Sequence, residues 1–206
     1  MAEGLALIDY GAGNLRSVEN ALKAAGAADV RVTADPEIVF GAERIVLPGV
    51  GAFAACMGAL SAIPGMVDAL NQRVIAQGAP FLGVCVGMQL MADAGEEFGT
   101  HPGLGWIKGT VARLEPNDPD ARVPHMGWND IVPVIPHPLI VPGEAYFLHS
   151  FGFEVADPET LAATTDHGGT VTAAVARDNL IGVQFHPEKS QRYGLDMLAR
   201  FLAWQP

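Results

Sequence analysis

Short apolar runs and helically spaced apolar residues take turns along the first half of the chain. Four apolar runs predict strands, at residues 5–9, 29–33, 44–47 and 80–84. Helical spacing predicts a helix over residues 14–25, and Pro64 begins or interrupts a later helix that runs towards Gln77. Because strands that alternate with helices imply right-handed parallel crossovers, this half predicts a doubly wound α/β fold around a mostly parallel sheet.

The pattern changes after about Gly99. Residues 111–138 are dense in proline and in short extended runs, and five further strands are predicted at residues 146–148, 151–155, 161–165, 171–177 and 181–185. A last helix is expected at about residues 193–204. This half therefore adds antiparallel strands to the sheet. Since no repeat or linker interrupts the pattern, residues 1–206 are expected to form a single domain.

Composition fits this architecture. Of the 206 residues 50% are apolar and 17% are charged, as expected for a sheet covered on both faces by helices, with room for an apolar interface with a partner. The net charge of −11 argues against binding to nucleic acid or to an anionic membrane surface. Its simplest role is to keep the protein in solution.

The chain has two cysteines, Cys56 and Cys85, which are too few for a disulfide framework in a protein of this length. Residues 1–10 lack the basic start and long apolar core of a signal peptide, and no apolar run reaches the roughly 18 residues of a membrane-spanning helix. A cytoplasmic, reducing location is therefore expected. Cys56 is expected to be buried and inert.

Cys85 lies in the segment that is richest in chemical information. An apolar strand approaches it, Gly83 and Gly87 flank it, and a helix-compatible run follows, which is the pattern of a nucleophile elbow. The glycines allow a sharp turn, and the helix N-terminus would favour the reactive thiolate. From this segment alone, a small buried cysteine in an ordinary turn is the alternative.

His186 and Glu188 supply the partners that a thiol nucleophile needs. A nucleophile requires a base, and the base requires a group that orients it. Pro187 biases His186 towards extended backbone, in which residues i and i+2 project to one side. Glu188 can then hold one imidazole nitrogen while the other faces Cys85. Taken singly, His186 could close a strand and Glu188 could be a solvated carboxylate.

These motifs resemble the class I, or triad, glutamine amidotransferases. The resemblance rests on residues 83–89, which read GVCVGMQ, together with His186-Pro187-Glu188. Four further segments are similar to the family of glutaminase subunits of imidazole glycerol phosphate synthase, namely residues 9–15, 48–53, 125–129 and 186–191. Val86 is one departure, since leucine is commoner there in the family. The resemblance implies a flavodoxin-like fold and a cysteine thioester mechanism that needs no cofactor or metal.

The remaining site residues follow from the residue pattern and the resemblance together. One oxyanion donor is expected at the N–H of Val86, and the second at Val50 or Gly51, where glycines permit an unusual backbone. The resemblance implies that this second donor can be misaligned until a partner binds. Substrate contacts are expected from Gly49, Gln89, Ser150 and Phe151. A surface glutamine on a helix is the alternative for Gln89.

The resemblance also implies a partner, a cyclase subunit with a (β/α)8 barrel that forms a heterodimer with this chain and receives its ammonia. Met126 and Trp128 are flanked by turn-forming residues and are expected outside any strand or helix, where they serve either an interface or the core. The full set of residues expected at the partner interface or along the ammonia route is Asn14, Met126, Trp128, Tyr146 and Lys189.

Several other interpretations stay open at this point. Gly11 and Gly13 weakly suggest a phosphate-binding loop, but the third position of that motif is Arg16. None of the six histidines has the spacing and support of a metal ligand. The rival functions are a glutaminase subunit for anthranilate or pyridoxal phosphate synthesis, a non-catalytic scaffold of the same fold, and a cysteine hydrolase.

Overall fold

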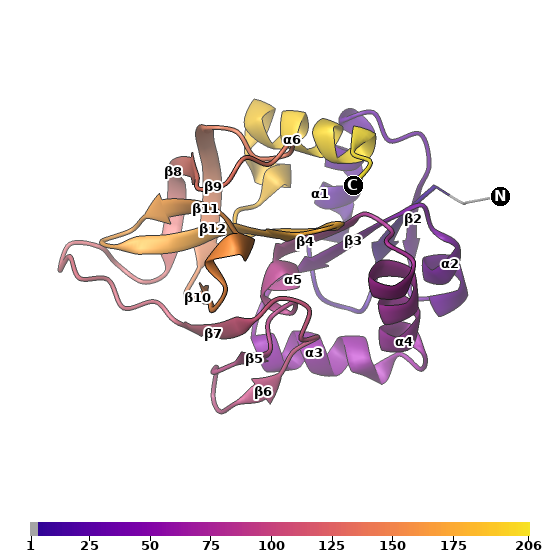
Figure 1. Cartoon of the computed structure of the whole chain (residues 1–206), viewed down its shortest axis with the longest axis horizontal. Coiled ribbons are helices and arrows are strands. Elements are labelled where there is room, and N and C mark those ends of the chain that lie inside the picture. The colour runs from indigo at the N-terminus through magenta and orange to yellow at the C-terminus, as the bar shows by residue number, and fades with distance from the viewer. Residues whose placement is uncertain (1–3) are drawn as a thin grey trace.

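The computed structural model describes residues 4–206, so residues 1–3 of the expected domain lie outside the described residues. A nine-stranded sheet forms its centre (Figure 1). From one edge to the other it contains β2 (Val30–Thr33), β1 (Leu5–Ile8), β3 (Arg44–Gly49), β4 (Phe81–Cys85), β13 (Leu180–Val183), β12 (Thr170–Arg177), β11 (Leu161–Asp166), β8 (His125–Pro133) and β9 (Gly143–His149). Pairing is parallel from β2 to β13 and antiparallel from β13 to β9. The predicted α/β fold with added antiparallel strands is confirmed.

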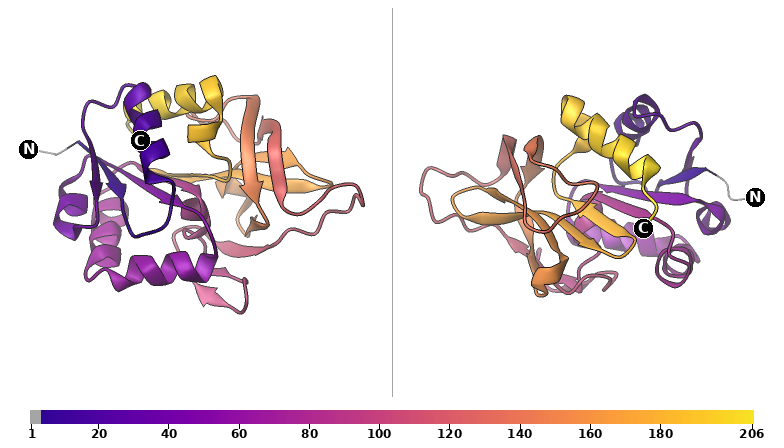
Figure 2. Two further views of the ribbon diagram at one scale, coloured as in Figure 1. Left: turned by 180° about the vertical axis from the view of Figure 1, so that it is seen from behind. Right: turned by 45° about the horizontal axis from the view of Figure 1, so that its top comes forward.

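Helices cover both faces of the parallel half. They are α1 (Leu15–Ala24), α2 (Pro36–Gly41), α3 (Phe53–Ala62), α4 (Met66–Leu70), a π-helical continuation (Asn71–Ala76), α5 (Val86–Gln89) and α6 (Gln191–Ala203). α1 and α6 lie together on one face, and α3 and α4 lie on the other (Figures 1 and 2). α1 buries Val18, Ala21 and Leu22, which are spaced by three and four residues and so share one face of the helix.

No single helix within residues 4–206 combines the length and the apolar composition that crossing a membrane requires. The helix pair Phe53–Ala62 and Met66–Ala76 passes that test only together, with a bend of 94° between its two parts.

A second, four-stranded sheet contains β10 (Phe151–Val155), β7 (Gly109–Arg113), β5 (Ala94–Gly95) and β6 (His101–Pro102) in that order. The strand at residues 151–155 was expected in the main sheet, but it pairs with β7 instead. Ser150 alone separates β9 from β10, so the chain leaves one sheet and enters the other within one residue. This change of sheet brings the backbone of Ser150 and Phe151 close to the end of β4.

Met126 and Trp128 lie within β8, so the expectation that they sit outside any strand is wrong. Their side chains alternate with inward-facing ones, and they are 61% and 46% exposed while His125 and Ile131 are buried. The alternation was hard to recognise in the sequence because Gly127 carries no side chain and the first buried position is a histidine. Pairing with β9 holds the strand, with Trp128 opposite Tyr146.

Glycines bring β4, α5 and β3 into backbone contact. A Cβ atom on Gly87 would overlap the carbonyl oxygen of Leu47, and one on Gly83 would lie 2.6 Å from the carbonyl oxygen of Gly87. Neither position allows a side chain without movement of the backbone. The tight turn at the end of β4 therefore depends on these two glycines.

We expect Gly87→Ala to lower the free energy of unfolding by about 3 kcal/mol, because the added methyl group meets rigid backbone. The matched control is Gly58→Ala, at an exposed position of α3 where an added Cβ has no atom within 4 Å. It should raise stability by up to about 1 kcal/mol, through helix propensity. Urea unfolding of both variants checks the prediction, and equal stabilities would contradict it.

Candidate active site

Cys85 stands at the carboxyl end of β4 in a strained backbone conformation, with φ 54° and ψ −112°. Positive φ is rare for residues other than glycine and costs free energy, and it clusters at functional sites. The sequence correctly indicated a sharp turn here. The flanking glycines, however, provide space for close packing, and Cys85 itself adopts the unusual φ.

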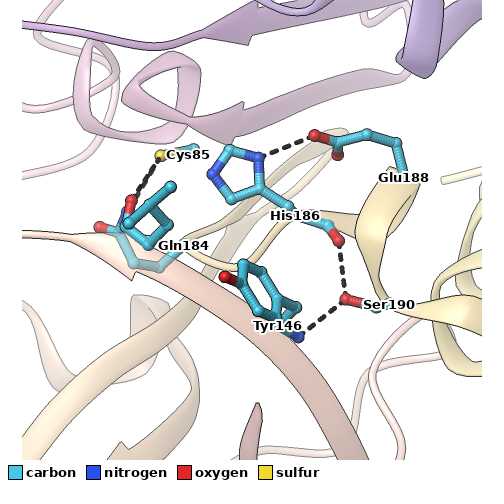
Figure 3. A network of polar contacts seen from close by, with 7 residues as sticks. Cys85, Tyr146, Gln184, His186, Glu188 and Ser190 are labelled. Atoms are coloured by element: carbon cyan, nitrogen blue, oxygen red, sulfur yellow. Dashed lines mark hydrogen bonds and ion pairs between the residues drawn. The ribbon is translucent and has the colours of Figure 1, made fainter. Parts of the chain in front are cut away.

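His186 and Glu188 form a buried pair beside Cys85 (Figure 3). The Nδ1 atom of His186 lies 2.8 Å from Oε1 of Glu188, and the two side chains are only 3% and 2% exposed. His186 has extended backbone, and Pro187 begins a 3₁₀ turn over Pro187–Lys189. The other side of the imidazole ring faces Cys85 in Figure 3. The structure thus brings together the three residues that the sequence singled out.

Hydrogen bonds from β9 fix the backbone of His186. Its N–H donates to the carbonyl of Tyr146 at 2.9 Å. The hydroxyl of Ser190 donates to the carbonyl of His186 at 2.7 Å and accepts the N–H of Tyr146 at 2.9 Å (Figure 3). This role of Ser190, two residues after Glu188, was not predicted from the sequence.

The electrostatic environment favours a protonated imidazole. Burial alone would lower the pKa of His186, but the Cys85 and Glu188 side chains act in the opposite direction and raise that pKa to about 9. At neutral pH this favours an imidazolium beside the sulfur atom. α5 is only four residues long, so the expected helix dipole amounts to little more than the free N–H groups of one turn.

A small pocket of about 160 Å³ opens at Cys85. Its walls include most of the predicted site residues, and its full lining is Val50, Gly51, Cys85, Val86, Gln89, Glu97, Leu148, His149, Ser150, Phe151, His186 and Lys189. Gly49 does not line it. A Cβ atom there would lie 2.7 Å from the nitrogen of Gly87 and 2.8 Å from the hydroxyl of Tyr10, so Gly49 serves close packing behind the pocket.

The loop after β3 is held from behind by two side chains. The hydroxyl of Tyr10 donates to the carbonyl of Pro48 at 2.7 Å, and the thiol of Cys56 donates to the carbonyl of Val50 at 3.3 Å. In a trans peptide the N–H points opposite to the preceding carbonyl, so the N–H of Gly51 points away from Cys56. Burial raises the pKa of Cys56, which keeps its thiol protonated as a donor. Cys56 is buried as expected, and it also contacts the loop.

Two buried glutamines, Gln89 on the pocket wall and Gln184 behind it, lie next to Cys85. Nε2 of Gln89 donates to the carbonyl of Phe151 at 2.9 Å and to Oε1 of Gln184 at 3.1 Å, and Nε2 of Gln184 lies 3.7 Å from the sulfur of Cys85. Gln89 is 4% exposed, so the alternative of a surface glutamine is wrong.

Gln184 and Glu97 were not predicted from the sequence. Gln184 is two residues before His186, so the same argument from extended backbone would have found it. Glu97 had no local signal, because it reaches the pocket only through the second sheet. One oxygen of its carboxylate accepts the N–H of Phe53 at 2.8 Å, at the start of α3.

Of the residues expected at an interface, Lys189 lines this pocket, and Tyr146 and Trp128 follow it outwards. The rings of Trp128 and Tyr146 meet edge to face with centroids 6.1 Å apart, and Nζ of Lys189 lies 6.0 Å from the centroid of Tyr146. Asn14 is exposed directly before α1, at the carboxyl edge of the parallel strands. The loop at Gly11 to Gly13 is held by an Asp9 carboxylate oxygen, which accepts the Gly11 N–H at 3.1 Å.

The fold and this site define a class of protein. The family model described as "Glutamine amidotransferase class-I" matches residues 6–204. A solved glutamine amidotransferase covers 97% of this chain and 98% of its own length with a TM-score of 0.75 at 18% identity. PurLQS from Thermotoga maritima gives a TM-score of 0.73, also at 18% identity, over 98% of this chain and 99% of its own. These distant structures establish the fold alone.

Closer relatives narrow the class. The chain is 65% identical over 205 residues to the imidazole glycerol phosphate synthase subunit HisH of Zymomonas mobilis, covering 98% of this chain and 96% of that relative. It is 54% identical to the subunit of the same name from Caulobacter vibrioides, over 98% and 99% of the two chains. The chain therefore belongs to the class-I glutamine amidotransferase family and, within it, to the family of HisH subunits of imidazole glycerol phosphate synthase.

The raised pKa of His186 makes stability depend on pH. A histidine whose pKa is higher in the folded chain stabilises the fold fully below its unfolded pKa, near 6.5, and that contribution is lost as the pH rises through about 9. We expect the free energy of unfolding to fall over this interval by at most about 1.4 kcal/mol per pH unit for the one proton involved. Urea unfolding from pH 6 to 9.5 measures this.

Cys85→Ala is the control, because it removes one of the two side chains that raise the pKa of His186. Its stability should fall less steeply over the same pH interval. Identical pH profiles for the two proteins would contradict the coupling between Cys85 and His186.

Proposed function

We propose that this chain hydrolyses glutamine to glutamate and ammonia through a thioester on Cys85. The ammonia passes to a cyclase subunit, a (β/α)8 barrel that forms a heterodimer with the chain, and is used there to make imidazole glycerol phosphate and an aminoimidazole carboxamide ribonucleotide. The observation that carries the proposal is the buried His186–Glu188 pair beside a strained cysteine at a strand end. The high identity to HisH subunits supports the pathway.

The sulfur of Cys85 attacks the carbonyl carbon of the glutamine side-chain amide, and a carbon–sulfur bond forms. His186 holds the proton of the thiol and gives it to the amide nitrogen as the carbon–nitrogen bond breaks, so that ammonia leaves. Water, deprotonated by His186, then cleaves the thioester to glutamate and restores the thiol. Glu188 orients the imidazole and stabilises its charged form.

The negative charge that develops on the substrate oxygen needs aimed N–H groups. The N–H of Val86 is free of helical hydrogen bonding because it belongs to the first turn of α5. The second donor comes from the loop at Val50 and Gly51, whose orientation the Cys56 thiol helps to set.

The amino-acid end of glutamine carries an ammonium and a carboxylate, and the pocket has a complement for each. We assign the ammonium to Glu97, which has a carboxylate oxygen beyond the one that accepts the Phe53 N–H. We assign the carboxylate to the backbone of Ser150 and Phe151. Gln89 lines the same pocket and donates to the carbonyl of Phe151, and we assign it a further contact with the substrate.

The cyclase subunit would cover the outer face of β8 and the adjoining edge of the pocket. Met126 and Trp128 expose large side chains there. We assign the ammonia route to Lys189, which lines the pocket, and to Tyr146, whose ring centroid lies 6.0 Å from Nζ of Lys189. Asn14 adds a polar contact.

We also propose that residues 1–206 act as one amidotransferase domain and that the chain works in the cytoplasm, where a reactive thiol stays reduced.

The rivals are less well supported. Identity to HisH subunits over nearly the full chain disfavours a glutaminase for anthranilate or pyridoxal phosphate synthesis. A scaffold without activity has no need for a buried carboxylate that orients a histidine towards a strained cysteine.

Glutamate release from glutamine tests the proposed function. We expect release to rise sharply when the cyclase subunit and its nucleotide ligand are added, and to fall to background in Cys85→Ser. Release that ignores the partner would leave the glutaminase chemistry standing and contradict the pathway. Absence of release under every condition would contradict the chemistry itself.

Glu97→Gln tests the assigned ammonium contact. Loss of the carboxylate charge should raise the KM for glutamine about tenfold and change kcat by less than about twofold, because ground state and transition state lose the same contact. Glu96→Gln removes an equal charge from the neighbouring exposed residue and should leave KM unchanged. Equal KM values for the two variants would refute the assignment.

A further inference from the structure

A hydrogen-bond network of polar side chains runs from β8 to the wall of the pocket. His125 and His149 are register partners in β8 and β9. Nδ1 of His125 lies 3.0 Å from Nε2 of His149, and Nδ1 of His149 lies 2.8 Å from the carbonyl oxygen of Phe151. At the outer end, Nδ2 of Asn129 lies 3.1 Å from Nε2 of His125. The proposed catalytic steps make no use of this hydrogen-bond network.

The position of each proton in the hydrogen-bond network follows from the groups at its two ends, the carbonyl of Phe151 and the amide of Asn129. The carbonyl of Phe151 can only accept, so Nδ1 of His149 carries a proton and, in the neutral ring, Nε2 accepts. His125 must then donate from Nδ1 and accept at Nε2, from the amide of Asn129. This amide is itself fixed, because its oxygen accepts the N–H of Asp130 at 2.9 Å and its nitrogen donates to the carbonyl of Asp166 at 2.7 Å.

Both imidazoles are held in the neutral form that this order of protons requires. Burial, with the neighbouring histidines His149 and His167, lowers the pKa of His125 to about 3. Burial also lowers the pKa of His149 to about 4. The ring of His125 is stacked between Phe147 and His167, with centroids 4.6 Å and 4.2 Å away. Ring rotation is therefore restricted as well as protonation.

The inner end of the hydrogen-bond network holds a backbone group at the pocket, the carbonyl of Phe151. The N–H of Leu114 donates to the carbonyl of Ser150 at 2.9 Å, which makes those two residues a hydrogen-bonded pair. Phe151 and Arg113, the next pair in the register, are then a non-hydrogen-bonded pair. The N–H and C=O of Phe151 both point away from β7, to the side of Gln89. His149 and Gln89 together occupy both lone pairs of this carbonyl.

We propose that Asn129, His125 and His149 are positioning residues that hold the carbonyl of Phe151 and thereby aim its N–H at the carboxylate of bound glutamine. This role rests on the proposed function, since it needs glutamine as the ligand. It would also connect substrate binding with β8, the strand whose outer face carries Met126 and Trp128.

The test uses the full chain with Cys85→Ser, so that glutamine binds without turnover. ¹⁵N NMR of the histidine rings should find the proton of both His125 and His149 on Nδ1. His125→Phe keeps the stacked ring and removes the donor to His149, and we expect it to weaken glutamine binding about fivefold, the equivalent of one hydrogen bond. Calorimetry gives the affinity, and the Phe151 amide resonance should shift.

Two further variants separate positioning from general damage. His125→Asn places an amide nitrogen where Nδ1 stood and should recover most of the affinity. His137→Phe removes a half-buried imidazole that does not belong to the hydrogen-bond network, and it should leave the affinity for glutamine unchanged. If His125→Phe does not fold, Asn129→Leu removes the outer donor at a more exposed position and should weaken binding in the same direction.

Two results would overturn the positioning role, and a third would contradict the proposed function. A folded His125→Phe chain, or a folded Asn129→Leu chain in its place, that binds glutamine with unchanged affinity would overturn the proposal. A proton on Nε2 of His149 in the starting chain would overturn it too, and neither result would affect the glutaminase function. Absence of glutamine binding by the starting chain would instead contradict the proposed function, and the positioning role with it.

Discussion

The hydrogen-bonded pair of His186 and Glu188 is the interaction on which the site depends. A carboxylate that is 2% exposed is costly unless it is paired, and His186 is its hydrogen-bond partner. Because β9 holds the backbone of His186 through Tyr146 and Ser190, the pair joins the antiparallel half of the sheet to the parallel half that carries Cys85. Loss of either side chain of the pair would leave the other as a buried charge without a partner.

A second constraint acts on the other side of the sulfur. Close packing of Gly83 and Gly87 against neighbouring backbone leaves Cys85 in a conformation with positive φ. The strain is maintained because backbone surrounds the turn, while Tyr10 and Cys56 hold the loop after β3 from behind. Stability and chemistry therefore rest on the same contacts.

The sequence predicted what local pattern can encode. The alternation of strands and helices gave the parallel half, and the segments around Cys85 and His186 identified the three residues that the structure brings together. What it missed depends on contacts between distant segments. Glu97 reaches the pocket through the second sheet, and β10 belongs to that sheet only because the chain turns at Ser150. Met126 and Trp128 were misplaced because Gly127 and a buried histidine hide the alternation of β8.

Reaction with 6-diazo-5-oxo-L-norleucine, a glutamine-shaped electrophile, tests most directly whether His186 and Glu188 activate Cys85 towards glutamine. Intact mass and peptide mapping, with the cyclase subunit present, should show one adduct, on Cys85 and not on Cys56. Its formation should slow by about 100-fold or more in His186→Asn, which removes the base. An adduct on Cys56, or one that forms on Cys85 at an unchanged rate in His186→Asn, would contradict the account.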